Sequence, residues 1–334
     1  MNFELIRDSL VEFRERLSNK IPSELLPVAR AAEQENPWFT ERSFFSAYRG
    51  IVSLLSEDSF RLYEQKYERL EMSSKTLGLV LAGNIPAVGF HDILIGLLAG
   101  CSLKIKLSSQ DKTLIMFLLQ ELFVVNPDLK SRVSLVQKLV IDQVDAVIAT
   151  GSNNTSRYFE QYFSKKPNII RKSRTSVAIL DGSESEGQLE KLTDDIFQYY
   201  GLGCRNVSKI LLTNGASIIP LMDELCLKTE VSQLTKYDNN YLYYKSIFLV
   251  NKEEFLDGET ILVKKSEDLH SPISVLHYQE FDSSERLNEY LNKEKDNIQC
   301  VVGNDYLPFG EAQNPGILDY PDGVDVRKFI HQLG

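Results

Sequence analysis

The chain has 334 residues, 43% of them hydrophobic, so it can build two domains with sizeable cores and is not a disordered chain. It has 47 acidic and 37 basic residues, a net charge of -10, which argues against a nucleic-acid-binding protein because such proteins present a basic face. The four cysteines form no CxxC pair, so we expect no zinc ribbon and predict no metal site.

The N-terminal residues do not read as a targeting segment. Residues 1–17 carry charges in every turn, unlike a signal peptide. No apolar run approaches the ~20 residues that are needed to cross a bilayer. We therefore expect no membrane span, a cytoplasmic location and free thiols.

The first 72 residues show helical periodicity. Apolar residues recur every three or four positions at Phe3, Ile6, Leu10, Phe13 and Leu17, which is the stripe of an amphipathic helix. Similar patterns follow through residues 25–35, 40–55 and 59–69, with prolines between them. We predict that residues 1–72 form a helical segment packed on the next domain. A docking surface for a partner protein is the alternative interpretation.

From residue 76 onward, short apolar runs alternate with helical patterns. The runs predict strands at 77–82, 102–107, 133–136, 145–150 and 176–180, and the helical patterns lie at 89–99, 110–123 and 152–163. This alternation predicts an α/β fold with a doubly wound sheet, and we assign residues 73–202 to a dinucleotide-binding domain.

Beyond residue 203 the signals are weaker but similar. Strands are expected at 209–212, 246–250, 273–277 and 299–302, and helices at 218–228 and 284–292. We assign residues 203–316 to a second α/β domain that carries a thiol, and residues 317–334 to a C-terminal segment.

The thiol in question is Cys204, which follows Gly201-Leu202-Gly203 between a helical pattern and a strand. Glycines allow the backbone to take conformations closed to other residues, so such a turn can expose a reactive thiol. Arg205 would favour the thiolate if its side chain pointed toward the sulfur. A small buried cysteine beside a turn is the simpler interpretation of this stretch taken alone.

Two loops of the first domain follow predicted strands. Asn84, in Gly83-Asn84-Ile85-Pro86, carries an amide that can stabilise an oxyanion, although an asparagine there often just bonds its own backbone. Gly151 and Ser152 open a helix, where backbone N–H groups can bind a phosphate, and Ser152 can equally be an ordinary N-cap.

The strand at 102–107 carries Lys104 and Lys106 on one face. Lys106 is nearer the carboxyl end, where ligands bind in open sheets, so it is the better candidate for a ribose or phosphate contact, with Ser108 beside it. No GxGxxG follows any strand, so the usual dinucleotide motif is missing. The four histidines are dispersed, and we expect them to be structural or exposed.

The order of these pieces resembles the aldehyde dehydrogenase superfamily, and within it the acyl-CoA reductase branch of LuxC-like fatty acyl reductases. The resemblance covers roughly residues 77–329. It rests on the following segments: Gly83-Asn84-Ile85-Pro86, Gly100-Cys101-Ser102-Leu103-Lys104-Ile105-Lys106, Thr150-Gly151-Ser152, Gly201-Leu202-Gly203-Cys204, Asp268-Leu269-His270-Ser271-Pro272, Pro308-Phe309-Gly310 with Pro315-Gly316, and Asp319-Tyr320-Pro321-Asp322-Gly323-Val324-Asp325.

The resemblance implies an aldehyde-dehydrogenase-like fold and a reductase that forms an aldehyde through an acyl-cysteine. It gives Cys204 the role of nucleophile and Asn84 that of oxyanion donor. The implied cofactor is a nicotinamide dinucleotide, and coenzyme A is the leaving group. We prefer NADPH to NADH because Lys106, Ser108 and Ser109 could accommodate a 2′-phosphate. The cofactor-binding residues that it implies are Lys106, Ser108, Gly151, Ser152 and Asp268, of which Asp268 replaces the family's usual glutamate.

One departure from the superfamily is informative. Ordinary aldehyde dehydrogenases place a water-activating glutamate in the segment that corresponds to residues 169–175, and this chain has no carboxylate there. The missing base favours acyl-CoA reduction over aldehyde oxidation. Arg171, Lys172 and Arg174 stand there instead; they would not accept a proton and could attract the phosphates of coenzyme A or of NADPH.

Two alternatives stay open from the sequence. One is a semialdehyde or acyl-phosphate reductase of the same superfamily, and the other is an inactive partner subunit that docks through residues 1–72. Acyl chain length, the acyl donor (coenzyme A, a carrier protein or an acyl-transfer partner) and the state of any homo-oligomer are also left open.

Overall fold

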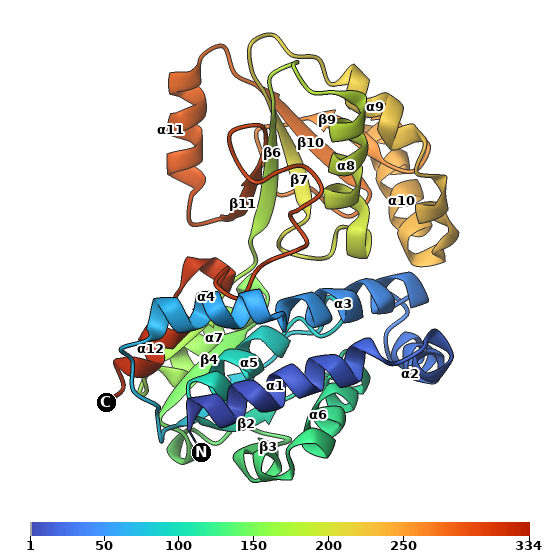
Figure 1. Cartoon of the computed structure of the whole chain (residues 1–334). Coiled ribbons are helices and arrows are strands. Elements are labelled where there is room, and N and C mark those ends of the chain that lie inside the picture. Colours follow the sequence, from blue (N-terminus) through green and yellow to red (C-terminus); the bar gives the residue numbers. More distant parts are fainter. Residues whose placement is uncertain (1) are drawn as a thin grey trace. The chain divides into compact units, whose positions relative to one another are not determined.

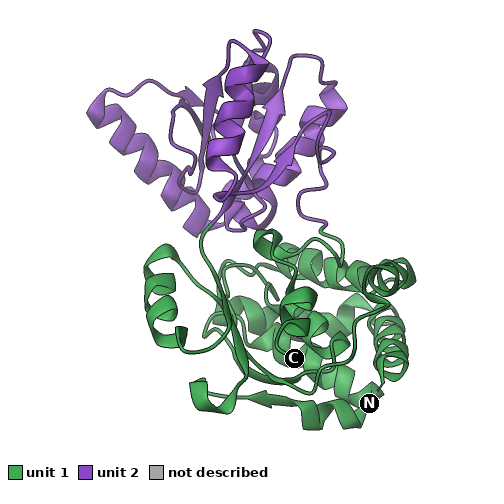
Figure 2. Ribbon diagram, turned by 90° about the vertical axis from the view of Figure 1, so that its left-hand side faces the viewer, with its two compact units in different colours: residues 1–173, 315–334 green, residues 174–314 purple. Residues whose placement is uncertain are grey.

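The structure, a computed structural model, describes residues 2–334 and divides into two compact units (Figures 1 and 2). Unit 1 contains the chain up to Ser173 together with Pro315–Gly334, and unit 2 contains Arg174–Asn314. Unit 2 is therefore an insertion in the chain of unit 1. Met1, the first residue of the predicted helical segment, lies outside the described residues.

The helical N-terminal segment is confirmed. It forms α1 (Phe3–Ser18), α2 (Pro22–Glu35), α3 (Glu41–Leu54) and α4 (Glu57–Tyr67). Asn2, Thr40 and Ser56 cap three of these helices, each side chain accepting a hydrogen bond from a backbone N–H three residues on. The predicted stripe of α1 is buried, and α1 and α2 pack against helices of the sheet domain.

The sheet of unit 1 is parallel and doubly wound, as predicted. Its strand order is β3-β2-β1-β4-β5, and every neighbouring pair is parallel. The strands are β1 (Thr76–Val80), β2 (Ser102–Lys106), β3 (Val133–Leu135), β4 (Ala146–Thr150) and β5 (Asn168–Arg171). The helices between them are α5 (Phe90–Leu98), α6 (Thr113–Val125) and α7 (Asn153–Phe163).

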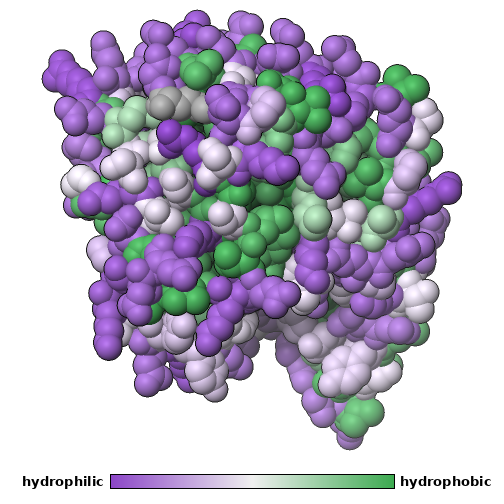
Figure 3. Space-filling view, turned by 90° about the horizontal axis from the view of Figure 1, so that it is seen from below, coloured by the Kyte–Doolittle hydropathy of each residue, from purple (hydrophilic) through white to green (hydrophobic). Residues whose placement is uncertain are grey.

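The edge of this sheet at β3 exposes apolar side chains. A groove of about 540 Å³ lies along α6 and β3, lined by Met116, Phe123, Val124 and Leu135 among others. Figure 3, which views the molecule from below, shows apolar side chains gathered among hydrophilic ones near the middle of that face. No helix in the described part of the chain is both long and apolar enough to cross a membrane.

Unit 2 is built on a second sheet with strand order β11-β6-β7-β10-β9-β8, parallel except for β8. Helix α11 lies on the opposite side of this sheet from α8 (Figure 1). The strands are β6 (Thr175–Leu180), β7 (Val207–Leu212), β8 (Leu256–Asp257), β9 (Leu262–Lys265), β10 (Val275–Glu280) and β11 (Ile298–Val302). The helices are α8 (Glu186–Phe197), α9 (Ile219–Cys226), α10 (Thr235–Asn251) and α11 (Ser284–Glu294).

Two details differ from the sequence-based expectation. The strand predicted at 246–250 is wrong, because these residues end helix α10, whose buried Tyr237, Tyr241 and Phe248 follow a helical rather than an alternating spacing. The compact units change at residue 174 and not at 203, because β6 pairs with β7 and β11 and so belongs to the second sheet. The roles that we assigned to the two domains stay predictions.

The C-terminal segment completes unit 1. Its helix α12 (Val326–His331) packs on α5. The Tyr320 hydroxyl forms a 2.7 Å hydrogen bond with the Tyr67 hydroxyl of α4, which also bonds the Asp325 carboxylate. A ring nitrogen of His91 lies 3.0 Å from the Ile317 carbonyl oxygen. Side chains far apart in the sequence thus tie this segment to the first helices.

Candidate active site

Five of the seven predicted site residues gather at one edge of the sheet in unit 1. Strands β2, β1 and β4 are neighbours and parallel, so their carboxyl ends meet there. Lys106 ends β2, the Asn84 loop follows β1, and Gly151 and Ser152 follow β4. The winding reverses between β1 and β4, which is where open α/β sheets bind ligands. Ser108 lies two residues beyond Lys106.

The start of α7 is shaped for an anion. Ser152 is the N-cap, and its hydroxyl accepts a hydrogen bond from the Thr155 N–H. A Cβ at Gly151 would lie 3.0–3.1 Å from Phe159 and Thr155, so a side chain there would crowd the helix. A helix start of this kind, directly after a strand, is where backbone N–H groups can bind a phosphate.

The loop that carries Asn84 is held by Asp111. The Ala87 N–H donates a 2.8 Å hydrogen bond to the Asp111 carboxylate, and Ala87 takes a left-handed φ of 55°. A Cβ at Gly83 would lie 2.4 Å from the Ser108 hydroxyl, so the loop also packs tightly on the end of β2. Burial raises the pKa of Asp111 to about 8, although its bond from Ala87 opposes the rise. Asn84 itself is exposed.

The segment without a glutamate contains a buried ion pair. Arg171 ends β5, is 4% exposed, and binds both carboxylate oxygens of Asp92 at 2.5 and 2.8 Å. The expectation that Arg171 attracts phosphates is therefore wrong, because its guanidinium is already paired inside the unit. Lys172 pairs with Glu160, and Arg174 donates to the Ile298 carbonyl.

In unit 2, Cys204 follows three consecutive left-handed residues. Tyr199, Tyr200 and Gly201 have φ angles of 52°, 58° and 78° within a short 3-10 segment, Gln198–Gly201. Such backbone costs about 1–3 kcal/mol for each non-glycine residue and persists only where the surroundings impose it. The two-glycine pattern predicted an unusual turn, and the structure shows one.

A single buried amide imposes this turn. Asn206, 2% exposed, accepts the Gly203 N–H at 2.8 Å. Its NH₂ group lies within hydrogen-bond distance of the carbonyls of Asp195, Ile196 and Gln198. The sequence analysis gave Asn206 no role, since nothing in its neighbours shows that its side chain turns back to the end of α8.

The late loop at 308–314 is anchored to the same turn. The Asp195 carboxylate accepts hydrogen bonds from the Gly310 and Ala312 N–H groups at 2.7 and 2.9 Å. Arg205 donates a hydrogen bond through Nε to the Ala312 carbonyl, so this nitrogen helps to hold the loop in place. Burial raises the pKa of Asp195 to about 6 against the effect of these bonds.

Ser176 joins the Cys204 turn to a second cysteine. Its hydroxyl lies 3.1 Å from the Cys204 carbonyl oxygen and 3.0 Å from the Cys300 sulfur on β11. It also accepts the Cys300 N–H at 3.2 Å. The residue is fully buried, so it is part of the support of the turn.

Asp268 lies in the connection from β9 to β10, and this connection passes the start of β7. The Lys209 ammonium donates to the Glu267 carbonyl at 2.8 Å, and the Ser208 hydroxyl bonds the Leu269 carbonyl at 3.4 Å. The structure therefore places exposed Asp268 near the strand that follows Cys204. Asn84 and Cys204 belong to different units, and their meeting in one site stays a prediction.

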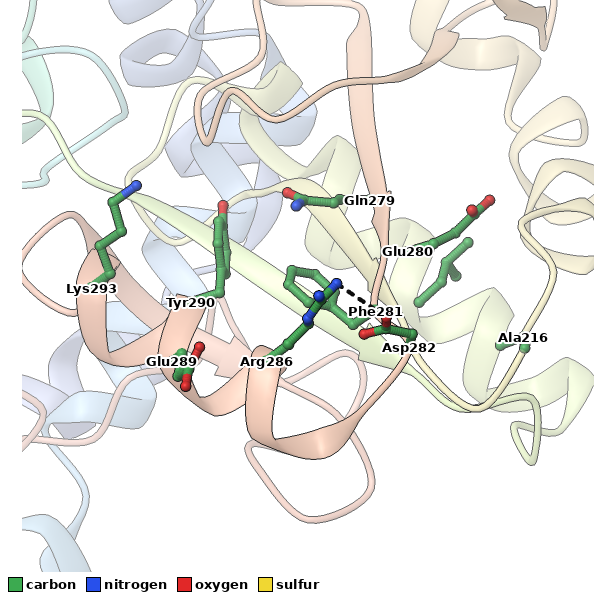
Figure 4. A pocket seen from close by; sticks show the side chains of 11 residues that line it. Ala216, Gln279, Glu280, Phe281, Asp282, Arg286, Glu289, Tyr290 and Lys293 are labelled. Carbon is green, nitrogen blue, oxygen red and sulfur yellow. Dashed lines mark hydrogen bonds and ion pairs between the residues drawn. The ribbon is translucent and has the colours of Figure 1, made fainter.

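A cavity of about 750 Å³ lies at the other end of β7 (Figure 4). It is lined by Leu212, the end of β10 and the α11 side chains Arg286, Tyr290 and Lys293, and Arg286 is paired with Asp282. No predicted site residue lines it, since Cys204 precedes the amino end of β7. Among residues 2–334, no three His, Cys, Asp or Glu side chains group to hold a metal.

Comparison with solved structures identifies the fold. Solved aldehyde dehydrogenases share the fold. A putative aldehyde dehydrogenase from Burkholderia cenocepacia aligns with a TM-score of 0.68 and 13% identity over 93% of this chain and 76% of the other. Aldehyde dehydrogenase 21 from Physcomitrella patens, in complex with the product succinate, aligns with a TM-score of 0.67 and 12% identity over 91% and 73%. The NAD+ complex of a Bacillus cereus aldehyde dehydrogenase gives 0.65 and 13% over 91% and 72%.

The amino-acid sequence identifies the family to which the chain belongs. The profile of the acyl-CoA reductase (LuxC) family matches residues 50–241, more than half of the chain. The chain belongs to this family and is an oxidoreductase with the fold of the aldehyde dehydrogenases. A comparison with curated protein sequences found no match.

Proposed function

We propose that the protein reduces a fatty acyl-CoA thioester to the aldehyde through an acyl-Cys204 intermediate, with NADPH as hydride donor. The observation that carries the proposal is the Cys204 turn. Its left-handed backbone is imposed by Asn206, within the part of the chain that matches the acyl-CoA reductase family. Cys204 is also partly exposed, whereas Cys101 is buried as a packing cysteine would be.

The chain's own groups perform two covalent steps in this proposal. The Cys204 thiolate attacks the thioester carbonyl, the bond to the coenzyme A sulfur breaks, and coenzyme A leaves as its thiol after taking up a proton. Asn84 and the Cys204 N–H donate hydrogen bonds to the oxyanion that forms. A bound nicotinamide supplies the hydride that reduces the acyl group. The resulting hemithioacetal at Cys204 breaks its C–S bond, which releases the aldehyde and restores the thiol.

The residues at the sheet edge of unit 1 suit a nicotinamide dinucleotide. The N-terminus of α7 at Ser152 suits the pyrophosphate, and Gly151 lets it approach. Lys106 and Ser108, with exposed Ser109, offer a cation and hydroxyls to a ribose 2′-phosphate. The acidic residues nearby are already bonded: Asp111 is 2% exposed and accepts from Ala87, and Glu35 accepts from Lys112 and Thr113. This favours NADPH over NADH. Asp268 would bind the nicotinamide ribose.

The buried Arg171–Asp92 pair supports transfer to a thiol over hydrolysis. A carboxylate that activates water needs a free oxygen facing the acyl group. Asp92 has both oxygens bound to Arg171, and no carboxylate stands between residues 169 and 175. An acyl-enzyme would then wait for hydride or for a returning coenzyme A. The acyl donor in this proposal is acyl-CoA or an acyl carrier, and a homo-oligomer, an acyl-transfer partner and a cytoplasmic location stay predictions.

The test is intact-protein mass spectrometry after incubation with octanoyl-CoA. We expect one octanoyl adduct on the wild type and on Cys226→Ala, none on Cys204→Ala, and its loss on adding NADPH with release of octanal. Octanal oxidation with NADP+ should require free coenzyme A. An adduct on the Cys204 variant, or rapid formation of free octanoate without coenzyme A, would refute the proposal.

A further inference from the structure

Helix α10, which lies at one margin of unit 2 (Figure 1), carries apolar side chains on both of its sides. On the inner side, Tyr241 and Phe248 pack with Leu262 of β9 and Val275 of β10. The outer face consists of four apolar residues that are 51–80% exposed: Leu242, Tyr243, Leu249 and Val250. A helix that is apolar all round is normally buried all round, so this outer face calls for a cover.

The outer face of α10 is one stripe with a symmetric order. Steps of three and four positions return to the same side of a helix, and Leu242, Ser246 and Leu249 follow such steps. Apolar residues stand three and four positions before Ser246 and again three and four positions after it. Ser246 is exposed at the centre, and its hydroxyl donates a 2.8 Å hydrogen bond to the Leu242 carbonyl of the same helix. The centre of the stripe is therefore small and already satisfied.

The charges around the stripe are committed elsewhere. Lys245 is the only charged residue between Leu242 and Val250, and its ammonium lies 2.5 Å from the Asp257 carboxylate and 2.9 Å from the Tyr241 hydroxyl. The chain's net charge of -10 also opposes binding to an anionic membrane surface. The cover that fits is therefore another apolar protein surface.

A second copy of this chain offers such a surface in the matching order. In an antiparallel pair of α10 helices, a two-fold axis at Ser246 sets Leu242 of each copy against Leu249 of the other, and Tyr243 against Val250. Ser246 at the crossing point lets the two helices approach closely. The four apolar side chains expose on the order of 500 Å² per copy, so two copies would bury about 1,000 Å² from them alone, the lower limit for a specific interface.

We propose that the outer face of α10 is a self-association surface, at which two copies of the chain pair antiparallel about a two-fold axis at Ser246. An interface of this size dissociates on dilution, so the monomer and the dimer exchange with protein concentration. The pairing buries the four exposed apolar side chains and leaves the Lys245–Asp257 ion pair at its rim. This proposal does not depend on the reaction proposed for Cys204.

The first test is sedimentation velocity of the full-length protein from roughly 1 to 200 µM, a range suited to the dissociation constants of small interfaces. We expect a monomer that becomes a dimer as the concentration rises. Leu249→Glu should raise the dissociation constant at least roughly 100-fold, because each dimer would bury two unpaired carboxylates. Val124→Glu is the matched control, since Val124 is also 61% exposed and lines the groove of α6 and β3.

Both variants should keep the thermal midpoint of the wild type, because both side chains are exposed. Val124→Glu should dimerise like the wild type. A wild type that stays monomeric over the whole range leaves the outer face to another occupant and overturns the proposal. An unchanged dissociation constant in Leu249→Glu, or dissociation caused by Val124→Glu alone, overturns it as well.

The second test fixes the direction of the pair. Ser246→Cys places two thiols beside the two-fold axis, so mild oxidation should join the two chains by a disulfide that dithiothreitol reverses. Leu249→Cys, one turn further along, faces Leu242 of the other copy and should cross-link at least roughly tenfold more slowly, because its two thiols are too far apart. The wild type, with its four cysteines, gives the background. Faster cross-linking of Leu249→Cys than of Ser246→Cys would contradict the antiparallel arrangement.

Discussion

The two candidate regions are built in different ways. In unit 1, the ends of three parallel strands bring Asn84, Lys106 and Ser152 to one edge, so regular hydrogen-bonded structure does the positioning. In unit 2, Cys204 stands before the amino end of β7, on an irregular turn that depends on the side chain of Asn206. Changes near the strand ends should therefore act locally, whereas changes in the support of the turn should reach both stability and chemistry.

The largest effect should come from Cys204→Ala. Removing a nucleophile typically lowers turnover by several orders of magnitude, and we expect at least about 10⁴-fold here. Steady-state reduction of octanoyl-CoA by NADPH is the measurement, and Cys226→Ala is the control. Turnover within tenfold of wild type would mean that the turn serves structure alone.

Asn84→Ala should come next. Loss of one oxyanion donor lowers turnover about 10²–10³-fold. Because Asn84 is exposed on its loop, we expect the thermal midpoint and the KM for NADPH to stay near their wild-type values. An unchanged turnover would assign Asn84 to turn formation.

Asn206→Ala tests the other side of the comparison. It removes hydrogen bonds to Gly203 and to three carbonyls in a buried place, so we expect a loss of about 3 kcal/mol in the free energy of unfolding. Turnover should fall roughly 10- to 100-fold because the thiol shifts. Urea denaturation with activity assays measures both, and Asn239→Ala, at an exposed position of α10, is the control. A loss of activity without loss of stability would contradict a supporting role.

The comparison also shows what the sequence can predict. Alternating apolar runs and helical patterns suffice for the sheet of unit 1, and hence for the edge where Lys106 and Ser152 lie. They do not reveal the Arg171–Asp92 pair, whose partners are 79 residues apart, or the bonds of Asn206 to the end of α8. The strand predicted at 246–250 was wrong for a related reason. These apolar residues look like a strand in isolation, but they continue the helix that begins at Thr235.

Ser109→Glu should have a smaller effect, on cofactor choice. A carboxylate beside Lys106 would repel a 2′-phosphate and accept a hydrogen bond from a ribose hydroxyl. We expect kcat/KM for NADPH to fall roughly tenfold relative to NADH. The distant Ser131→Glu is the control. An unchanged ratio would show that the 2′-phosphate lies elsewhere.

Asp111→Asn should leave activity near neutral pH almost unchanged and alter only the pH dependence of stability. With the pKa of Asp111 raised to about 8, the folded protein keeps a proton that the unfolded chain releases above about pH 4. This group therefore lowers the free energy of unfolding as pH rises from about 4 to about 8.

The Asp111→Asn variant lacks this pH-dependent contribution to the free energy of unfolding, and its amide oxygen can still accept a hydrogen bond from the Ala87 N–H. Its stability relative to wild type should rise between pH 5 and pH 8, measured as urea midpoints. The exposed Asp58→Asn should show no such trend. A constant difference across this range would mean that Asp111 is ionised in the folded protein.

The insertion of unit 2 within unit 1 sets an order for folding on the ribosome. All strands of unit 2 have been made once Val302 emerges, so that unit can close while the chain is still growing. Unit 1 must wait, because Tyr320 and α12 follow unit 2 in the chain and they pair with α4 and α5, which precede it. The unit that begins first is thus the one that finishes later, and in a nascent chain the surfaces of α4 and α5 that contact Tyr320 and α12 stay uncovered until His331 has emerged.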